Sequence, residues 1–255
     1  MRIATYNIWN DDRGGEARRK QLVHEITGLD ADVIALQEVR PEQFRDDLAG
    51  LVPHAAFRTY AGEDEGLAIL SRHPILGTTW LHELPEHGCS AALNILIDCE
   101  DRRVSVTDLH LPWDSALEKE RQIVAIDRFI HGQAADVRIL SGDFNSSTNS
   151  SVHRYLTGEQ SLLGCEARPY WYELSSTYAA LQGHPLPPTL DFQHNPRWGG
   201  RNTTEIPIAA DRIYVMLHEG TDDLRHVWRF GMDVSPESGY APSDHYGVAA
   251  EISFA

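Results

Sequence analysis

Six short polar clusters, each attached to a strand-like apolar run, are spread along the 255-residue chain. They read Thr5-Tyr6-Asn7, Leu36-Gln37-Glu38-Val39, Asp108-Leu109-His110-Leu111, Gly142-Asp143-Phe144-Asn145, Asp211-Arg212-Ile213-Tyr214 and Ser243-Asp244-His245-Tyr246-Gly247. Carboxylates, carboxamides and imidazoles at the ends of buried strands are unfavourable unless they converge on one site, because a desolvated charge needs a partner or a metal. The pattern therefore predicts an enzyme.

The cluster around Asp143 has the residue types that phosphoester hydrolysis needs. Asp143 and Asn145 lie two positions apart, directly after the apolar run Val137 to Leu140. Their side chains therefore share a face if the strand geometry continues. The carboxylate can orient or deprotonate water, while the carboxamide donates a hydrogen bond to a phosphoryl oxygen. The alternative is a surface turn after the strand.

Two other clusters combine carboxylates with Asn or His. Glu38 ends an apolar run, where a metal would remove the desolvation penalty of a buried carboxylate, and Mg²⁺ prefers oxygen ligands. Asn7, which ends the first run, would be a second ligand or would orient Glu38. Asp244 and His245 are adjacent, so they can serve one site only from a loop or a bulge. An Asx-type turn is the alternative there.

The elements that position these clusters are predicted from the alternation of apolar and polar residues. The expected strands are Ile3 to Trp9, Val33 to Gln37, Leu67 to Ser71, Leu93 to Asp98, Arg103 to His110, Val137 to Ser141, Arg212 to Leu217 and Gly247 to Phe254. The expected helices are Arg18 to Thr27, Glu42 to Leu51 and Ala116 to Ile130. A tight turn at Asp101-Arg102-Arg103 would make Leu93 to His110 a hairpin. Short strands and few helices predict two packed sheets with helices outside them.

The longest stretch without a predicted element runs from Gly164 to Pro207 and is rich in Pro, Gly and aromatic residues. Loops of this length inside a compact domain are usually functional. We expect Tyr170, Trp171 and Trp198 to bind substrate, because they offer flat apolar surface for a ring, an acyl group or a sugar. The alternative is that these rings only pack the loop onto the sheets. His194 receives no role.

Together, and in this order, the clusters resemble the endonuclease/exonuclease/phosphatase superfamily. The resemblance extends from Ile3 to about Val248, and the segment Gly66-Leu67-Ala68-Ile69-Leu70-Ser71-Arg72-His73-Pro74-Ile75 is similar to another family segment. The superfamily includes type I deoxyribonucleases, abasic-site endonucleases, inositol-polyphosphate phosphatases, neutral sphingomyelinases and tyrosyl-DNA phosphodiesterases. The resemblance implies an α/β fold, a DNase I-like four-layer α/β/β/α sandwich. It also implies a metal-dependent phosphoesterase that uses direct attack of water.

The resemblance also implies roles for the catalytic residues. Asp143 would be the base or the residue that positions water, and Asn145 would contact the transition state. Asp211 would fix the tautomer of His245 and keep it protonated toward the phosphate. His110 stands where family members carry His or Tyr and would bind phosphate.

For the metal, the resemblance implies that Glu38 and Asn7 hold Mg²⁺ or Mn²⁺, and it leaves Asp244 as a metal or water contact. Arg72, in the additional family-like segment, is expected to bind substrate. Abasic-site endonucleases tend to have an acidic residue two positions after the first-strand Asn, where this chain has Trp9. That departure argues against an abasic-site activity.

The formal charge of −16 bears on the substrate, because nucleic-acid binders usually carry a basic stripe and the only Lys/Arg run here is Arg18-Arg19-Lys20. We therefore expect a small phosphorylated metabolite, a lipid head group or a simple phosphodiester. The alternatives are a DNA nuclease or DNA-end-processing phosphodiesterase, and a catalytically silent binding module.

Length and composition suit a single domain spanning residues 1–255. No basic leader or long apolar segment is present, so we expect a protein that is neither exported nor membrane-spanning. The three cysteines, Cys89, Cys99 and Cys165, lack metal-ligand spacing and favour reduced thiols in a cytoplasmic protein, with Cys89 to Cys99 pairing left open.

Overall fold

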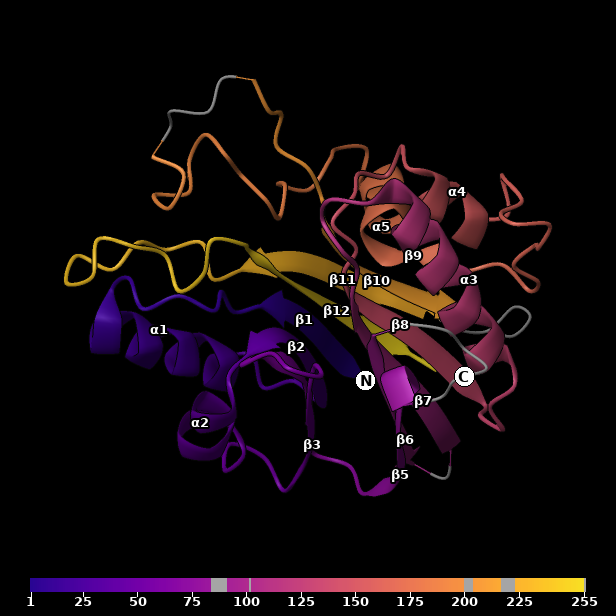
Figure 1. Ribbon diagram of the computed structural model, residues 1–255, viewed down its shortest axis with the longest axis horizontal. Helices are drawn as coiled ribbons and strands as arrows, with labels where there is room; N and C mark the ends of the chain where they lie inside the picture. The colour runs from indigo at the N-terminus through magenta and orange to yellow at the C-terminus, as the bar shows by residue number, and fades with distance from the viewer. Residues whose placement is uncertain (84–90, 101, 200–203, 217–222, 255) are drawn as a thin grey trace.

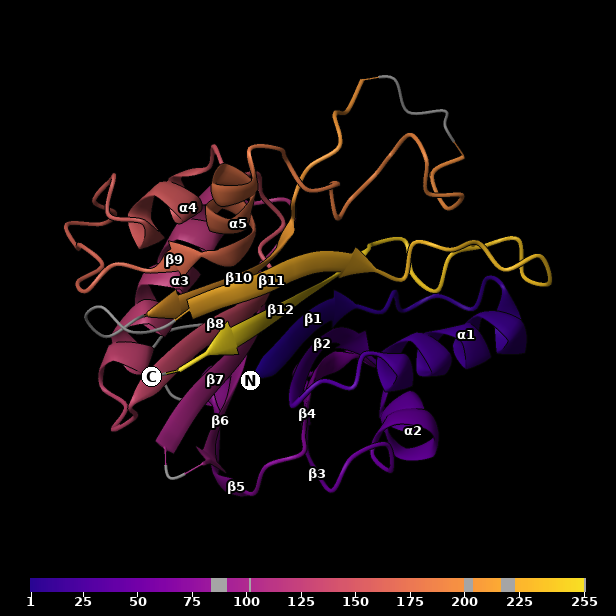
Figure 2. The ribbon, with the colours of Figure 1, turned by 180° about the vertical axis from the view of Figure 1, so that it is seen from behind.

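Two six-stranded sheets pack face to face in the computed structural model, which describes residues 1–83, 91–100, 102–199, 204–216 and 223–254. The strand order is β11-β12-β1-β2-β4-β3 in the first sheet and β5-β6-β7-β8-β10-β9 in the second. Helices α1 and α2 lie outside the first sheet, and α3, α4 and α5 lie on the side of the second (Figures 1 and 2). The predicted four-layer α/β/β/α sandwich is confirmed.

The bounds of the elements are as follows. The first sheet contains β1 (Arg2–Asn7), β2 (Val33–Val39), β3 (His54–Thr59), β4 (Gly66–Ser71), β11 (Asp223–Phe230) and β12 (Gly247–Ser253). The second contains β5 (Ile75–Trp80), β6 (Ala92–Cys99), β7 (Arg102–His110), β8 (Val137–Asp143), β9 (Tyr172–Glu173) and β10 (Asp211–Met216). The helices are α1 (Gly15–Gly28), α2 (Pro41–Gln43), the π-helical η1 (Phe44–Leu48), the 3₁₀ turn η2 (Leu81–Glu83), α3 (Ala116–His131), α4 (Ser151–Leu156) and α5 (Leu174–Gln182).

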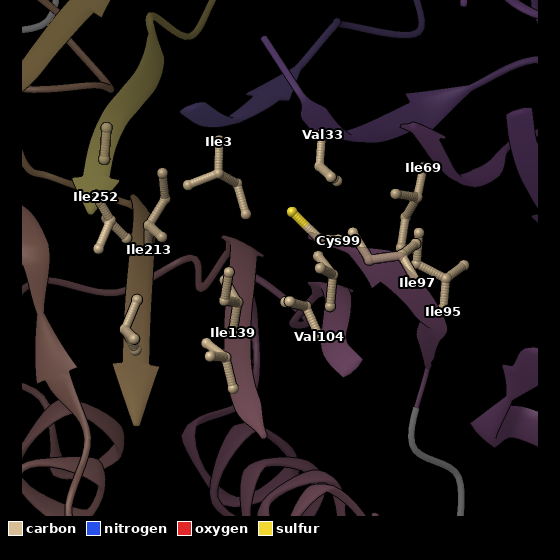
Figure 3. Close-up of a cluster of buried hydrophobic side chains, with 14 of the residues drawn as sticks. Ile3, Val33, Ile69, Ile95, Ile97, Cys99, Val104, Ile139, Ile213 and Ile252 are labelled. Atoms are coloured by element: carbon tan, nitrogen blue, oxygen red, sulfur yellow. The ribbon is translucent and has the colours of Figure 1, made fainter. Parts of the chain in front are cut away.

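The main apolar core lies between the two sheets. Figure 3 shows Ile3, Val33, Val104, Ile139 and Ile213 from both sheets directed into one cluster. Two further clusters join each sheet to its outer helices. Each central strand is therefore buried on both faces, and polar side chains inside the strands, such as Asn94, Ser105 and Thr107, bond to one another.

Strand pairing gathers the predicted polar residues at one edge of the sandwich. β1 runs parallel to β2 with Asn7 beside Gln37, and β7 runs parallel to β8 with His110 beside Asp143. β10 is antiparallel to β8 and begins at Asp211, which pairs with Asp143. The carboxyl ends of four strands and the amino end of β10 therefore meet at the same edge.

The period-2 alternation of the strands turns these side chains inward. On β8, Ile139 faces the core between the sheets, whereas Leu140 faces the helical layer. Asp143 has the parity of Ile139, so it points between the sheets just beyond the end of the apolar core. Asp211 on β10 has the same parity as the core residue Ile213.

All eight predicted strands are present, and β6 and β7 form the predicted hairpin. Asp101 of the predicted turn and Leu217 lie outside the described residues, as do Cys89 and Arg201. The prediction was wrong in three other places. It missed β3, β5, β9 and β11, it made one helix of α2 and η1, and it left α4 and α5 as irregular chain. Within the described part of the chain, no helix is long and apolar enough to cross a membrane.

Candidate active site

The buried carboxylate of Asp143 lies at the centre of the polar cluster. Its Oδ2 is 3.1 Å from Asn7 Nδ2, 3.5 Å from His110 Nε2 and 3.9 Å from His245 Nε2. Its Oδ1 accepts the backbone N–H of Asn145 at 2.7 Å. Burial favours the neutral acid, but the charges of His245 and His110 and the donated hydrogen bonds lower the pKa of Asp143 below its usual value. Asp143 is therefore an ionised acceptor at neutral pH.

His245 pairs with Asp211, as predicted from the family resemblance. Its Nδ1 lies 2.8 Å from Asp211 Oδ2, and both side chains are buried. Burial opposes the imidazolium, yet the carboxylates of Asp211 and Asp143 raise the pKa of His245 well above its usual value. The ring is therefore held as a cation whose Nε2–H faces Asp143.

The segment that carries Asp244 and His245 is a loop, which is the condition for both residues to serve one site. β12 begins only at Gly247. Ser243 Oγ donates to the carbonyl of Asn7 at 2.6 Å and accepts the backbone N–H of His245 at 3.2 Å. The loop is thus fastened to the end of β1.

Glu38 reaches the cluster through a bulge. The β2–β4 register shifts between Leu36 and Val39, and Glu38 has φ 59°, a left-handed value that turns its side chain away from the regular alternation. Its Oε1 accepts from Asn7 Nδ2 at 2.9 Å, and its Oε2 accepts the backbone N–H of Asn10 at 2.9 Å. Because the Asn7 amide also donates to Asp143, it orients both carboxylates.

Asp244 lies beside these acids and is 8% exposed. Burial raises its pKa to about 6, and the charges of Glu38 and Asp143 contribute to the increase. Ligand atoms of Asp143, Asp211 and His245 also lie within 4.8 Å of one another. Four acidic side chains, those of Glu38, Asp143, Asp211 and Asp244, therefore share this edge of the sandwich with His245.

Asn145 lies beside Asp143 but not on a continued strand. Its φ is 44°, and its N–H bond to the buried carboxylate of Asp143 closes an Asx turn, so the strand does not continue and the turn is not at the surface. Its Nδ2 donates to Leu111 O at 2.9 Å, and Lys119 Nζ donates to Asn145 O at 2.6 Å. The turn is held rigidly at the end of β8.

The structure does not bring Arg72 to this centre. Arg72 follows Ser71, which pairs with Val33 at the start of β2, whereas Glu38 is near the end of β2. Its guanidinium pairs with Asp30 on the opposite edge of the sheet. The prediction that Arg72 binds substrate is therefore wrong for this centre. Because β4 runs antiparallel to β2, Arg72 lies next to the start of β2, whereas Glu38 lies near its end.

Two of the predicted aromatic residues also lie away from the centre. Trp171 is 1% exposed and donates its Nε1–H to Asp127 Oδ1 at 2.7 Å within the core under α3 and α4. Tyr170 lies directly over Gly158 after α4, on the outer layer of helices. The alternative, that these rings pack the loop onto the fold, holds for Trp171.

Trp198 is the predicted aromatic residue that does lie beside the centre. Its Nε1–H donates to Asp244 O at 3.4 Å, and its ring packs edge-on against Phe192. His194, which received no role, is bonded through Nδ1 to Asp191 and its side chain is 78% exposed.

Two cations that were not predicted from the sequence hold the Asn145 turn. Arg212 is fully buried on β10, donates to the backbone carbonyl and the hydroxyl of Ser146, and lies over the ring of Phe144. Lys119, at the start of α3, donates to the Asn145 carbonyl. A signal for Arg212 existed, because an arginine inside the apolar run of β10 needs buried acceptors.

Buried contacts of Gln37 and Thr189, which were also not predicted, support the strands that carry the centre. Gln37 Nε2 donates to Asp108 Oδ1 at 2.6 Å, and burial raises the pKa of Asp108 well above its usual value, so this acid is neutral. Thr189 Oγ1 accepts the backbone N–H groups of Ala210 and Asp211. Both contacts fix the strand ends that carry His110 and Asp211.

Comparison with known proteins places the chain in a family. A model described as the endonuclease/exonuclease/phosphatase family matches residues 4–245. No curated protein matches the chain at the level of significance applied.

Three solved structures share the fold over all of this chain. A functionally unknown conserved protein from Enterococcus faecalis V583 has 24% identity, TM-score 0.72 and 100% of its own chain covered. A truncated Caenorhabditis elegans TDP2 has 16% identity, TM-score 0.77 and 97% covered. The human Nocturnin catalytic domain with bound sulfate anion has 17% identity, TM-score 0.69 and 93% covered. With the match of the family model over nearly its whole length, the chain belongs to the endonuclease/exonuclease/phosphatase family of metal-dependent phosphoesterases.

Proposed function

We propose that this protein hydrolyses the phosphoester bond of a small phosphorylated metabolite, a lipid head group or a simple phosphodiester by direct attack of water. The observation that carries the proposal is the convergence of Asn7, His110 and His245 on one oxygen of Asp143. These groups combine an ionised base with hydrogen-bond donors around one point, as phosphoryl transfer to water requires.

Each residue then has a distinct part in the reaction. Asp143 is ionised and accepts the proton of the attacking water. His245, kept cationic by Asp211, directs Nε2–H toward the phosphoryl oxygens and offsets the charge that develops there. His110, at the end of β7, and Asn145, just after β8, donate to the same phosphoryl group.

The residues present fit a divalent cation, Mg²⁺ or Mn²⁺. Glu38 and Asp244 form no ion pair with Lys or Arg among the described residues, and the charge of Glu38 disfavours ionisation of Asp244. Oxygen donors of this kind suit Mg²⁺, so Glu38 and Asp244 would hold the ion and Asn7 would orient Glu38. When bound, the cation polarises a phosphoryl oxygen and stabilises the leaving oxygen.

The surface charge and the free thiols support the remaining parts of the proposal. A protein of formal charge −16 binds polyanionic nucleic acid weakly, so a small ester is favoured over duplex DNA. Cys99 and Cys165 carry free thiols, which supports a reducing, cytoplasmic location.

A phosphoester panel tests the function. The panel contains 4-nitrophenyl phosphate, bis(4-nitrophenyl) phosphate, glycerophosphocholine, single-stranded DNA and plasmid DNA, each with magnesium, manganese or excess chelator. We expect metal-dependent turnover of a small ester and none in chelator. Efficient DNA cleavage at physiological salt would instead assign the centre to nucleic acid. Failure on every ester would leave a catalytically silent binding module.

A further inference from the structure

Arg197 lies between two indole rings beside the acidic centre. Its Cζ is 5.6 Å from the ring centroid of Trp9 and 4.7 Å from that of Trp198. A guanidinium is weakly hydrated and stacks well on indole rings, so this arrangement fixes the charged group in one place before any ligand arrives.

Both tryptophans are hydrogen-bonded to residues of the centre. Trp9 donates its backbone N–H to Asn7 Oδ1 at 3.0 Å, and Trp198 donates its Nε1–H to Asp244 O at 3.4 Å. The guanidinium therefore stands beside the backbone of Asp244, next to the indole that is bonded to it.

The donors of Arg197 are not used within the described part of the chain. Its Nε is enclosed without an acceptor, while its two terminal nitrogens have no acceptor and are not enclosed. Nearby arginines differ, because Arg13 pairs with Asp11 and Arg40 pairs with Asp12. Arg212 and Lys119 also lack an ion-paired carboxylate, but Ser146 and Asn145 accept their donors, whereas the side chain of Arg197 has no acceptor among the described residues.

We propose that Arg197 binds a second oxyanion of the substrate, a phosphate or a carboxylate, beyond the phosphoester that is cleaved. The inference rests on the proposed function. The scissile phosphoryl group already has His110, His245 and Asn145 as donors, whereas Arg197 stands beside Trp198, whose indole donates to Asp244 O, and makes no contact with Asp143. The two terminal nitrogens of a guanidinium match two oxygens of one oxyanion, and the half-buried indole of Trp198 offers apolar surface to the part of the substrate between the two charges.

Calorimetric titration with non-hydrolysable probes tests the inference. Methylphosphonate carries one oxyanion, methylenebisphosphonate adds a phosphonate, and phosphonoacetate adds a carboxylate. All three are titrated with magnesium in excess over the probe, into the wild type, Arg197→Met, Arg197→Lys and the control Arg45→Met. Arg45 is an exposed arginine whose side chain pairs with Asp46 and has no contact with the residues of the centre. Thermal melting of each variant establishes that it is folded.

We expect the wild type and Arg45→Met to bind one of the two-charge probes about tenfold more tightly than methylphosphonate. The tighter of the two identifies the second group as phosphate or carboxylate. Arg197→Met should lose that preference, and Arg197→Lys should keep only part of it. An unchanged preference in Arg197→Met, or no preference in the wild type, would overturn the inference. If the preference is present but no ester is hydrolysed, the proposed function fails and the subsite stands.

Discussion

His245 Nδ1 and Asp211 Oδ2 lie 2.8 Å apart, and this contact fixes which ring nitrogen is left to face the catalytic carboxylate. The other nitrogen, Nε2, then points toward Asp143 at 3.9 Å. A cationic donor and an ionised base therefore act on one small volume. Asp143 ends β8 and His245 lies just before β12, so both residues are buried at the same edge of the sandwich.

Asp143 and His245 should act on the same chemical step. We expect Asp143→Asn and His245→Ala each to lower kcat by roughly 10² or more, and the double variant to fall far short of the product of the two losses. Single-turnover hydrolysis of an aryl phosphoester measures the three rates, with Arg45→Met as a control that should match wild type. Multiplicative losses would show that the two residues have separate roles.

Asn7 should control metal affinity through its two hydrogen bonds. Asn7→Ala removes the donor shared by Glu38 and Asp143, so the two carboxylates repel each other without an intervening amide. We expect the magnesium concentration for half-maximal activity to rise by about tenfold. Magnesium titrations of activity compare this variant with Asn149→Ala, a surface asparagine near α4. An unaltered midpoint would remove the orienting role.

Trp171 and Trp198 should separate in their effects on stability and binding. Trp171→Phe leaves Asp127 without the indole donor, and we expect a loss of about 1–3 kcal/mol in the free energy of unfolding with KM unchanged. Trp198→Ala should raise KM for the preferred substrate with a smaller effect on unfolding. Denaturant titrations and steady-state kinetics make the comparison. A raised KM in Trp171→Phe would contradict the structural role and indicate that Trp171 contacts the substrate.

His131 should give the fold a stability that depends on pH. The hydrogen bond and charge of Asp127 raise the pKa of His131, although burial opposes the change. The contribution is thus fully present below the unfolded value of about 6.5 and is lost as pH rises through the folded pKa. The difference in Tm between wild type and His131→Gln should shrink over that range. A difference that grows with pH would contradict the assignment.

The sequence predicted the centre better than it predicted the sheet margins. β3, β5, β9 and β11 are the four edge strands of the two sheets, and all four were missed. An edge strand is buried on one side only, so its alternation is weak. β5, with exposed Leu76, Gly77 and Thr78, shows this most clearly. The central strands, buried on both faces, were all found.

Predictions of residue roles were wrong where the role depended on the position along a strand or on the surroundings of the side chain. Arg72 and Glu38 lie on neighbouring strands, and only the antiparallel register shows that they are at opposite ends. Trp171 lies in a segment with the composition of a surface loop. Its hydrogen bond to Asp127 is a tertiary contact, which the sequence does not reveal. Arg197 could not be assigned a role from the sequence, because its contacts with Trp9 and Trp198 join distant parts of the chain.

The most direct test of the central claim is hydrolysis of bis(4-nitrophenyl) phosphate and 4-nitrophenyl phosphate by the wild type and Asp143→Asn, each in magnesium and in excess chelator. The account predicts turnover of at least one ester by the wild type in magnesium. That turnover should be lost in chelator, restored by added magnesium or manganese, and lowered by roughly 10² or more in Asp143→Asn. Full activity in excess chelator, or an Asp143→Asn variant as active as the wild type, would contradict it.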